Sequence, residues 1–241
     1  MTEPIVIDRR FCGPPTSGHG GYSCGMVAAR VGGRPAEVTL RTPPPLDTPL
    51  AVERDDSGVR VLDGETLVAV AAPIAHVDLE LPQPVAPGDA RAAAATSWIL
   101  EQPEGHPFAS CFVCGSARSA GDGLRVFVGP VVGRAGLYAA EWVPDSFLAN
   151  DNGVVGDEFV WSVLDCAGGI GALYDVDTAE TPSVLGRFAV DVRESVRVGE
   201  RCVTAGWEIS RDGRKRDAGS VMWRADGTVV GAGRATWVQL R

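Results

Sequence analysis

A carboxylate at the centre of an apolar helix is the residue of this sequence best suited to chemistry. Apolar side chains recur between residues 157 and 174 with helical spacing over a wide face, which predicts a deeply buried helix. Asp165 lies in its middle. An ionised carboxylate is costly to bury unless it is paired or used, so we expect Asp165 to be functional. The alternative is that it only hydrogen-bonds a neighbouring backbone group.

A glycine-rich turn near the amino end of the chain is the second candidate. His19, Gly20 and Gly21 precede a small and apolar segment that predicts a buried helix reaching Arg30. The first N–H groups of a helix have no intrahelical acceptor, and glycine lets a ligand atom approach the backbone closely. The turn therefore leaves backbone donors available to a ligand, and the His19 ring and Tyr22 are expected to line the site.

Short runs of β-type residues separated by Pro, Asp and Gly follow each of these helices and predict antiparallel strands. The runs are 36–40, 50–54, 59–62 and 66–72 after the first helix, and 183–192, 201–210, 220–224 and 228–240 after the second. Further strands are expected at 124–128 and 136–142. A Pro- and Ala-rich segment, 83–105, is expected to connect two similar halves, 1–82 and 106–241. The predicted fold class is α+β.

Two segments of the second half are similar to a known family. His106-Pro-Phe-Ala-Ser-Cys-Phe-Val-Cys-Gly115, followed by Gly-Leu-Arg-Val-Phe at 123–127, resembles the opening of hotdog-fold acyl-CoA thioesterase-like proteins. Val-Leu-Asp at 163–165, with Gly-Gly at 168–169, resembles the middle of their central helix. The resemblance, to a tandem double-hotdog form of the PaaI-like branch, implies two long central helices side by side, wrapped by one continuous antiparallel sheet.

In that branch the carbonyl is polarised by a backbone N–H of a His-Gly-Gly turn, and the carboxylate lies on the facing helix, nine positions beyond the histidine of its own unit. The first half has the turn, but position 28 is an alanine. The second half has Asp165, but Gly156 stands nine positions before it and no glycine pair follows. The two losses are complementary. The resemblance therefore implies one composite catalytic site, made of Gly20, Gly21 and Asp165.

The function implied by this resemblance is an acyl-CoA thioesterase-like protein that hydrolyses or binds an acyl thioester where the halves meet. The alternatives are a non-catalytic binder of acyl-CoA or another lipophilic ligand, and a structural protein with no ligand. The chain is acidic overall, but its many arginines allow a locally basic pocket. Arg125 and Arg187 are the candidates for binding the substrate.

A serine hydrolase is a further alternative, because residues 21–25 read Gly-Tyr-Ser-Cys-Gly and match the nucleophile elbow with Ser23 at its centre. That elbow must follow a buried strand, whereas a Gly- and Pro-rich segment comes before it here. Cys111 and Cys114 could form half of a zinc site, with His106 as a further ligand, but no second pair with ligand spacing follows. We therefore expect a structural role for the pair, with no metal and no cofactor.

Charge and hydropathy narrow the classes of partner. The formal net charge of −9 and the scarcity of lysine argue against a nucleic-acid surface, which needs a basic face to displace counterions. No stretch approaches the roughly 20 apolar residues needed to span a bilayer, and the first residues lack the basic and apolar regions of a signal peptide. We therefore expect a cytoplasmic protein with reduced cysteines and no membrane partner. The sequence leaves open whether it forms a homo-oligomer.

Overall fold

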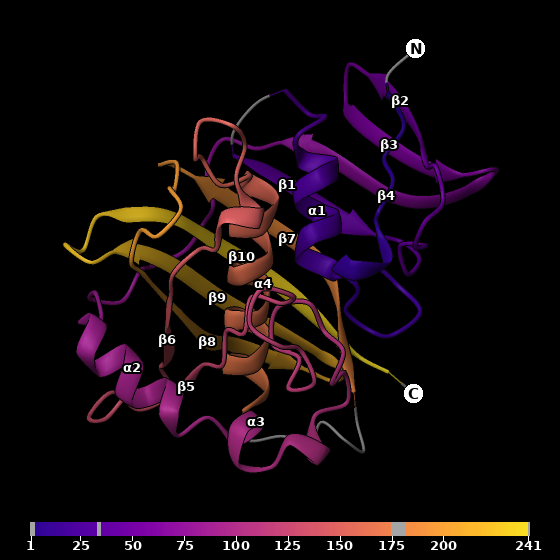
Figure 1. The fold of residues 1–241 in the computed structure, drawn as a ribbon. Helices are drawn as coiled ribbons and strands as arrows, with labels where there is room; N and C mark the ends of the chain where they lie inside the picture. Colours follow the sequence, from indigo (N-terminus) through magenta and orange to yellow (C-terminus); the bar gives the residue numbers. More distant parts are fainter. Residues whose placement is uncertain (1–2, 33–34, 175–181, 241) are drawn as a thin grey trace.

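A ten-stranded antiparallel sheet with two helices on one face forms the body of the protein (Figure 1). The computed structural model describes residues 3–32, 35–174 and 182–240. The strands are β1 (Ala36–Leu40), β2 (Ala51–Asp55), β3 (Gly58–Asp63), β4 (Thr66–Pro73), β5 (Gly129–Pro130), β6 (Tyr138–Trp142), β7 (Ser183–Val192), β8 (Cys202–Asp212), β9 (Lys215–Arg224) and β10 (Val229–Gln239). The α+β prediction is confirmed.

The strand order repeats after each central helix. Helix α1 (Gly20–Ala28) precedes strands ordered β1-β4-β3-β2, and helix α4 (Asp157–Leu173) precedes strands ordered β7-β10-β9-β8. The two sets meet where β1 pairs antiparallel with β7, so one sheet runs through both. This repetition supports the proposed division of the chain into two similar halves.

The second half is the more complete of the two. Strands β6 and β5 extend its sheet beyond β8. In the first half β2 is the edge strand, and an isolated bridge joins Ile5 to Leu50, the residue before β2. Helix α1 has 9 residues and α4 has 17, so the first helix is shorter than expected. The chain turns soon after α1, where Gly32 has a φ of 79°, a conformation that favours glycine.

The sheet is covered on both faces because its strands alternate their side chains between two cores. On β9, Ala218 and Met222 join the large core that contains α4, whereas Val221 and Trp223 join a smaller one. The smaller core lies under α2 (Pro87–Ala95), which belongs to the expected connection and packs against β6, β5 and β8. The connection continues through α3 (Trp98–Glu101) and a short 3₁₀ helix (Pro103–Gly105). Within the described residues no helix is long and apolar enough to cross a membrane.

Glycines allow α1 and α4 to pack at very short distance. A Cβ atom added at Gly21 would lie 2.6 Å from the Trp161 carbonyl oxygen, and one added at Gly25 would lie 2.6 Å from Glu158 Cα. These two glycines are four residues apart and therefore share one face of α1. Any larger side chain on that face would push the helices apart.

Gly25→Ala should therefore destabilise the fold by about 1–3 kcal/mol, the usual cost of overpacking a tight contact. The matched control is Gly88→Ala in α2, where an added Cβ would meet nothing within 4 Å and should stabilise the protein by about 0.5–1 kcal/mol. Urea unfolding of both variants measures the difference. Equal stability of the two variants would contradict the close approach of the helices.

Candidate functional site

Asp165 and the first turn of α1 are in direct contact at the centre of the molecule. The Gly21 N–H donates to Asp165 Oδ2 at 2.6 Å, and the Asp165 side chain is only 1% exposed. The other carboxylate oxygen, Oδ1, is buried and has no hydrogen-bond partner among the described residues. One oxygen is thus fixed by a helix N-terminus, while the second keeps its capacity to accept a proton.

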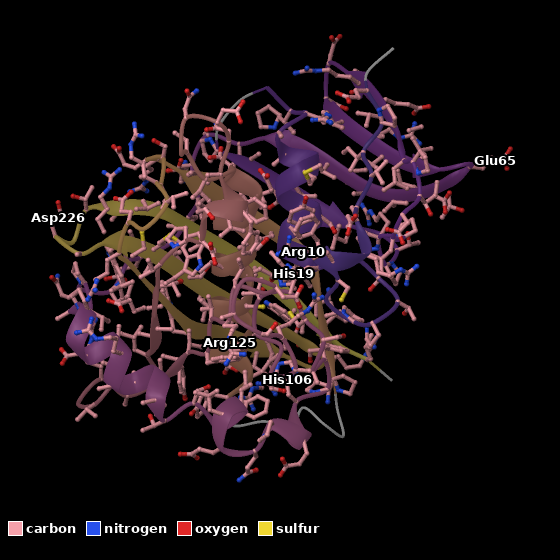
Figure 2. The ribbon with its side chains drawn as sticks, viewed as in Figure 1. Arg10, His19, Glu65, His106, Arg125 and Asp226 are labelled. Carbon is pink, nitrogen blue, oxygen red and sulfur yellow. The ribbon has the colours of Figure 1, made fainter. Side chains whose placement is uncertain are left out.

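The amino end of α1 supplies two further polar groups. The Gly20 N–H donates to no acceptor within residues 3–32, 35–174 and 182–240. His19 caps the helix, because its Nδ1 accepts a hydrogen bond from the Tyr22 N–H at 3.2 Å. A neutral His19 ring therefore carries its proton on Nε2, which lies 3.7 Å from Asp165 Oδ2 and 3.2 Å from Cys166 Sγ. Figure 2 shows His19 in the interior, beside the two central helices.

Burial governs the electrostatics of this group. It raises the pKa of Asp165 to about 6, although His19 and the Gly21 N–H act in the opposite direction. Burial also opposes a charge on His19, but Cys111 and Asp165 nearby leave the pKa of its imidazole raised on balance. A carboxylate held in this way is more basic than one in water.

A cleft of about 510 Å³ opens onto these groups. Both halves contribute to its wall: Leu40 comes from the end of β1, Leu185 from β7 and Trp237 from β10. The wall of the cleft is mainly apolar. The lining also includes His19, Gly20, Arg41, Phe108, Cys111, Cys114, Asp165, Cys166, Val184 and Val238.

Solved structures with the same arrangement cover almost the whole chain. The acyl-CoA thioesterase II TesB2 of Mycobacterium marinum is 12% identical, with a TM-score of 0.61 over 93% of this chain and 90% of that one. A candidate thioesterase of Novosphingobium aromaticivorans is 12% identical, with a TM-score of 0.59 over 97% of this chain and 93% of that one. The tesB protein of Mycobacterium avium subs paratuberculosis is 11% identical, with a TM-score of 0.56 over 92% of this chain and 87% of that one. The chain has the double-hotdog fold. No protein-family model and no curated protein matches the sequence.

The double-hotdog cleft contains only some of the residues expected from the sequence. His19, Gly20 and Asp165 line it. Gly21 is not part of the lining, but its N–H donates a hydrogen bond to Asp165. Tyr22 points away into an aromatic cluster, stacked on Phe11 with ring centroids 4.2 Å apart. Its position one residue after the turn gave no indication of this direction, which is set by the rotation of α1.

Neither of the two expected arginines is part of the cleft wall. Arg187 is exposed on β7 and faces Glu37 of the neighbouring strand, with 3.8 Å between Nε and Oε1. Arg125, labelled in Figure 2, is exposed on a loop. It donates to the Arg118 carbonyl and lies over the Phe127 ring. The arginine of the lining is instead Arg41, which is exposed just after β1.

The serine-elbow alternative loses its structural context. Ser23 lies inside α1, is buried, and its hydroxyl has no hydrogen-bond partner among the described residues. An elbow requires the serine at an exposed turn between a strand and a helix. Gly21 and Gly25 of the same motif serve the contact between the helices.

Proposed function

We propose that the double-hotdog cleft binds an acyl thioester of the acyl-CoA type and hydrolyses it with Asp165. The observation that carries the proposal is the meeting of Asp165 with the turn at Gly20 and Gly21, each supplied by a different half. The mainly apolar wall suits an acyl chain. Two of the solved structures of the same fold that cover most of the chain are described as thioesterases, which supports the same reaction class.

The proposed reaction uses the unpaired groups of the site. The Gly20 N–H donates to the thioester carbonyl oxygen and stabilises the negative charge that develops there. Asp165 Oδ1 takes a proton from water, whose oxygen attacks the carbonyl carbon. The carbon–sulfur bond then breaks, and the leaving thiolate takes up the proton. Direct attack by the carboxylate is the other route open to Asp165, through an anhydride that water then cleaves.

Asp165→Asn should lower kcat for acyl-CoA hydrolysis by about 100-fold or more, the usual effect of removing a general base. The amide keeps the shape of the side chain and can still accept the Gly21 hydrogen bond, so binding of acyl-CoA should change little. Steady-state assays over a range of chain lengths, together with calorimetric binding, separate the two effects. The matched control is Asp191→Asn, which only breaks a surface ion pair with Arg193.

Full activity of Asp165→Asn would show that the carboxylate is not part of the reaction. A wild-type protein that binds acyl-CoA but hydrolyses none at any chain length would instead be a non-catalytic binder. One observation favours that second candidate function: the Gly21 N–H is already paired with Asp165, which leaves a single backbone donor for the carbonyl.

Arg41→Ala should raise KM for acyl-CoA about two- to fivefold and leave kcat unchanged. The effect is small because an exposed ion pair between Arg41 and a phosphate of coenzyme A contributes little to binding. Arg41 is exposed in the cleft wall, and its guanidinium forms no ion pair within the described part of the chain. Arg187→Ala is the matched control, since Arg187 is exposed on β7 but does not line the cleft. If both variants have the same KM, the phosphates of coenzyme A do not bind at Arg41.

A further inference from the structure

Three cysteines gather at the edge of the candidate site. Cys111 and Cys114 lie on the loop that follows the connection, and Cys166 follows Asp165 on α4. The Cys166 sulfur lies 3.4 Å from that of Cys114 and 4.0 Å from that of Cys111. All three side chains are buried, yet all three line the cleft. The reaction proposed above uses none of them.

Two histidines point their Nε2 atoms at these sulfurs. His19 Nε2 lies 3.2 Å from Cys166 Sγ, and His106 Nε2 lies 3.3 Å from Cys114 Sγ. In both rings Nδ1 accepts a backbone hydrogen bond, from the Tyr22 N–H at 3.2 Å and from the Phe108 N–H at 3.0 Å. The neutral rings therefore carry their protons on Nε2 and donate to sulfur. Each N–H donor favours a negative charge on the sulfur that it faces, although burial raises the pKa of the Cys166 thiol while no metal is bound.

We propose that Cys111, Cys114 and Cys166 bind one Zn²⁺ ion as thiolates, with the fourth coordination position directed into the cleft. A tetrahedral zinc site with Zn–S distances of about 2.3 Å places its sulfurs about 3.8 Å apart. The separations of the Cys166 sulfur from those of Cys114 and Cys111, 3.4 and 4.0 Å, lie on either side of that value. Binding releases the three thiol protons to solvent.

The histidines belong to the surroundings of this zinc site and are not its ligands. His19 Nε2 lies within 4.8 Å of the Cys111 and Cys166 sulfurs, so distance alone would allow it to coordinate. A ring that binds zinc through Nε2 must carry a proton on Nδ1, where the Tyr22 N–H already points. The N–H dipoles of His19 and His106 instead offset the net negative charge of three thiolates around one Zn²⁺.

Spacing in the sequence could not reveal the third ligand. It lies 52 residues beyond Cys114, on a helix whose contact with the 106–115 loop arises only on folding. Without a second Cys-x-x-Cys pair, the sequence predicts that Cys111 and Cys114 are structural and bind no metal. This prediction and the zinc proposal differ in the zinc content expected per chain. The zinc proposal does not depend on hydrolysis, because metal content is measured without substrate.

The first experiment uses the full wild-type chain, purified with a reductant and separated from free metal. We expect about one zinc per chain by elemental analysis, and a Co²⁺ titration of the metal-free protein that ends at one equivalent with a thiolate-to-cobalt charge-transfer band. Less than about one tenth of an equivalent of zinc, together with no such band, would overturn the proposal. A disulfide between two of these cysteines that persists in the reductant would also overturn the proposal.

Serine variants locate the ion. Cys166→Ser and Cys114→Ser should each weaken zinc binding at least tenfold in competition with a chelator, whereas Cys202→Ser should bind as the wild type does. Cys202 is equally buried but lies on β8, outside the cleft lining. Equal zinc affinity in all three variants would exclude the cluster as the site. The Co²⁺ titration of the wild type decides the matter even where a variant fails to fold.

A variant of His106 tests the surroundings. His106→Phe keeps a ring against Trp98, which now stacks on His106 with centroids 5.7 Å apart, but removes the N–H that faces Cys114. Zinc affinity should fall about 10- to 100-fold, as on loss of other hydrogen bonds to metal ligands, while one equivalent still binds. Unchanged affinity would contradict the assigned N–H to sulfur bond.

Discussion

The contact between the amino end of α1 and the middle of α4 is the constraint on which the rest of the structure depends. A hydrogen bond of 2.6 Å from the Gly21 N–H to Asp165 ties the helices together, and glycine at positions 21 and 25 leaves room for the α4 backbone. Because both helices lie on one face of the sheet, their separation also fixes how β1 and β7 meet. The cleft follows from this geometry, since its wall is taken from both helices and from three strands beside them.

The same contact makes burial of the carboxylate tolerable and leaves one of its oxygens without a partner in the described residues. A fully buried Asp would be too costly without a partner, and the helix N-terminus supplies one for Oδ2. Oδ1 is left without a partner in the described residues, which is a cost that a purely structural hydrogen bond would not require. Natural sequences accept such local conflicts mostly at functional sites. The unpaired Oδ1 therefore indicates a function for Asp165 more clearly than the paired Oδ2 does.

Sequence reasoning recovered what local patterns encode. Helical recurrence located α4 to within a residue, and the β-type run expected at 183–192 is β7 with the same bounds. It could not give the directions of side chains, which depend on how elements rotate against one another. Tyr22 turned into the core and Arg187 to the surface for that reason. Cys166 escaped notice because its neighbours are brought to it by tertiary packing alone.

The pairing of β1 with β7 inside one chain has a consequence for how the protein behaves on dilution. When two halves of a cleft belong to separate molecules, the fraction of assembled sites falls as the concentration drops below the dissociation constant. Here the connection keeps the halves at a fixed, high effective concentration, so the assembly of the cleft does not depend on how much protein is present. A cell could keep this protein at very low abundance without losing the site.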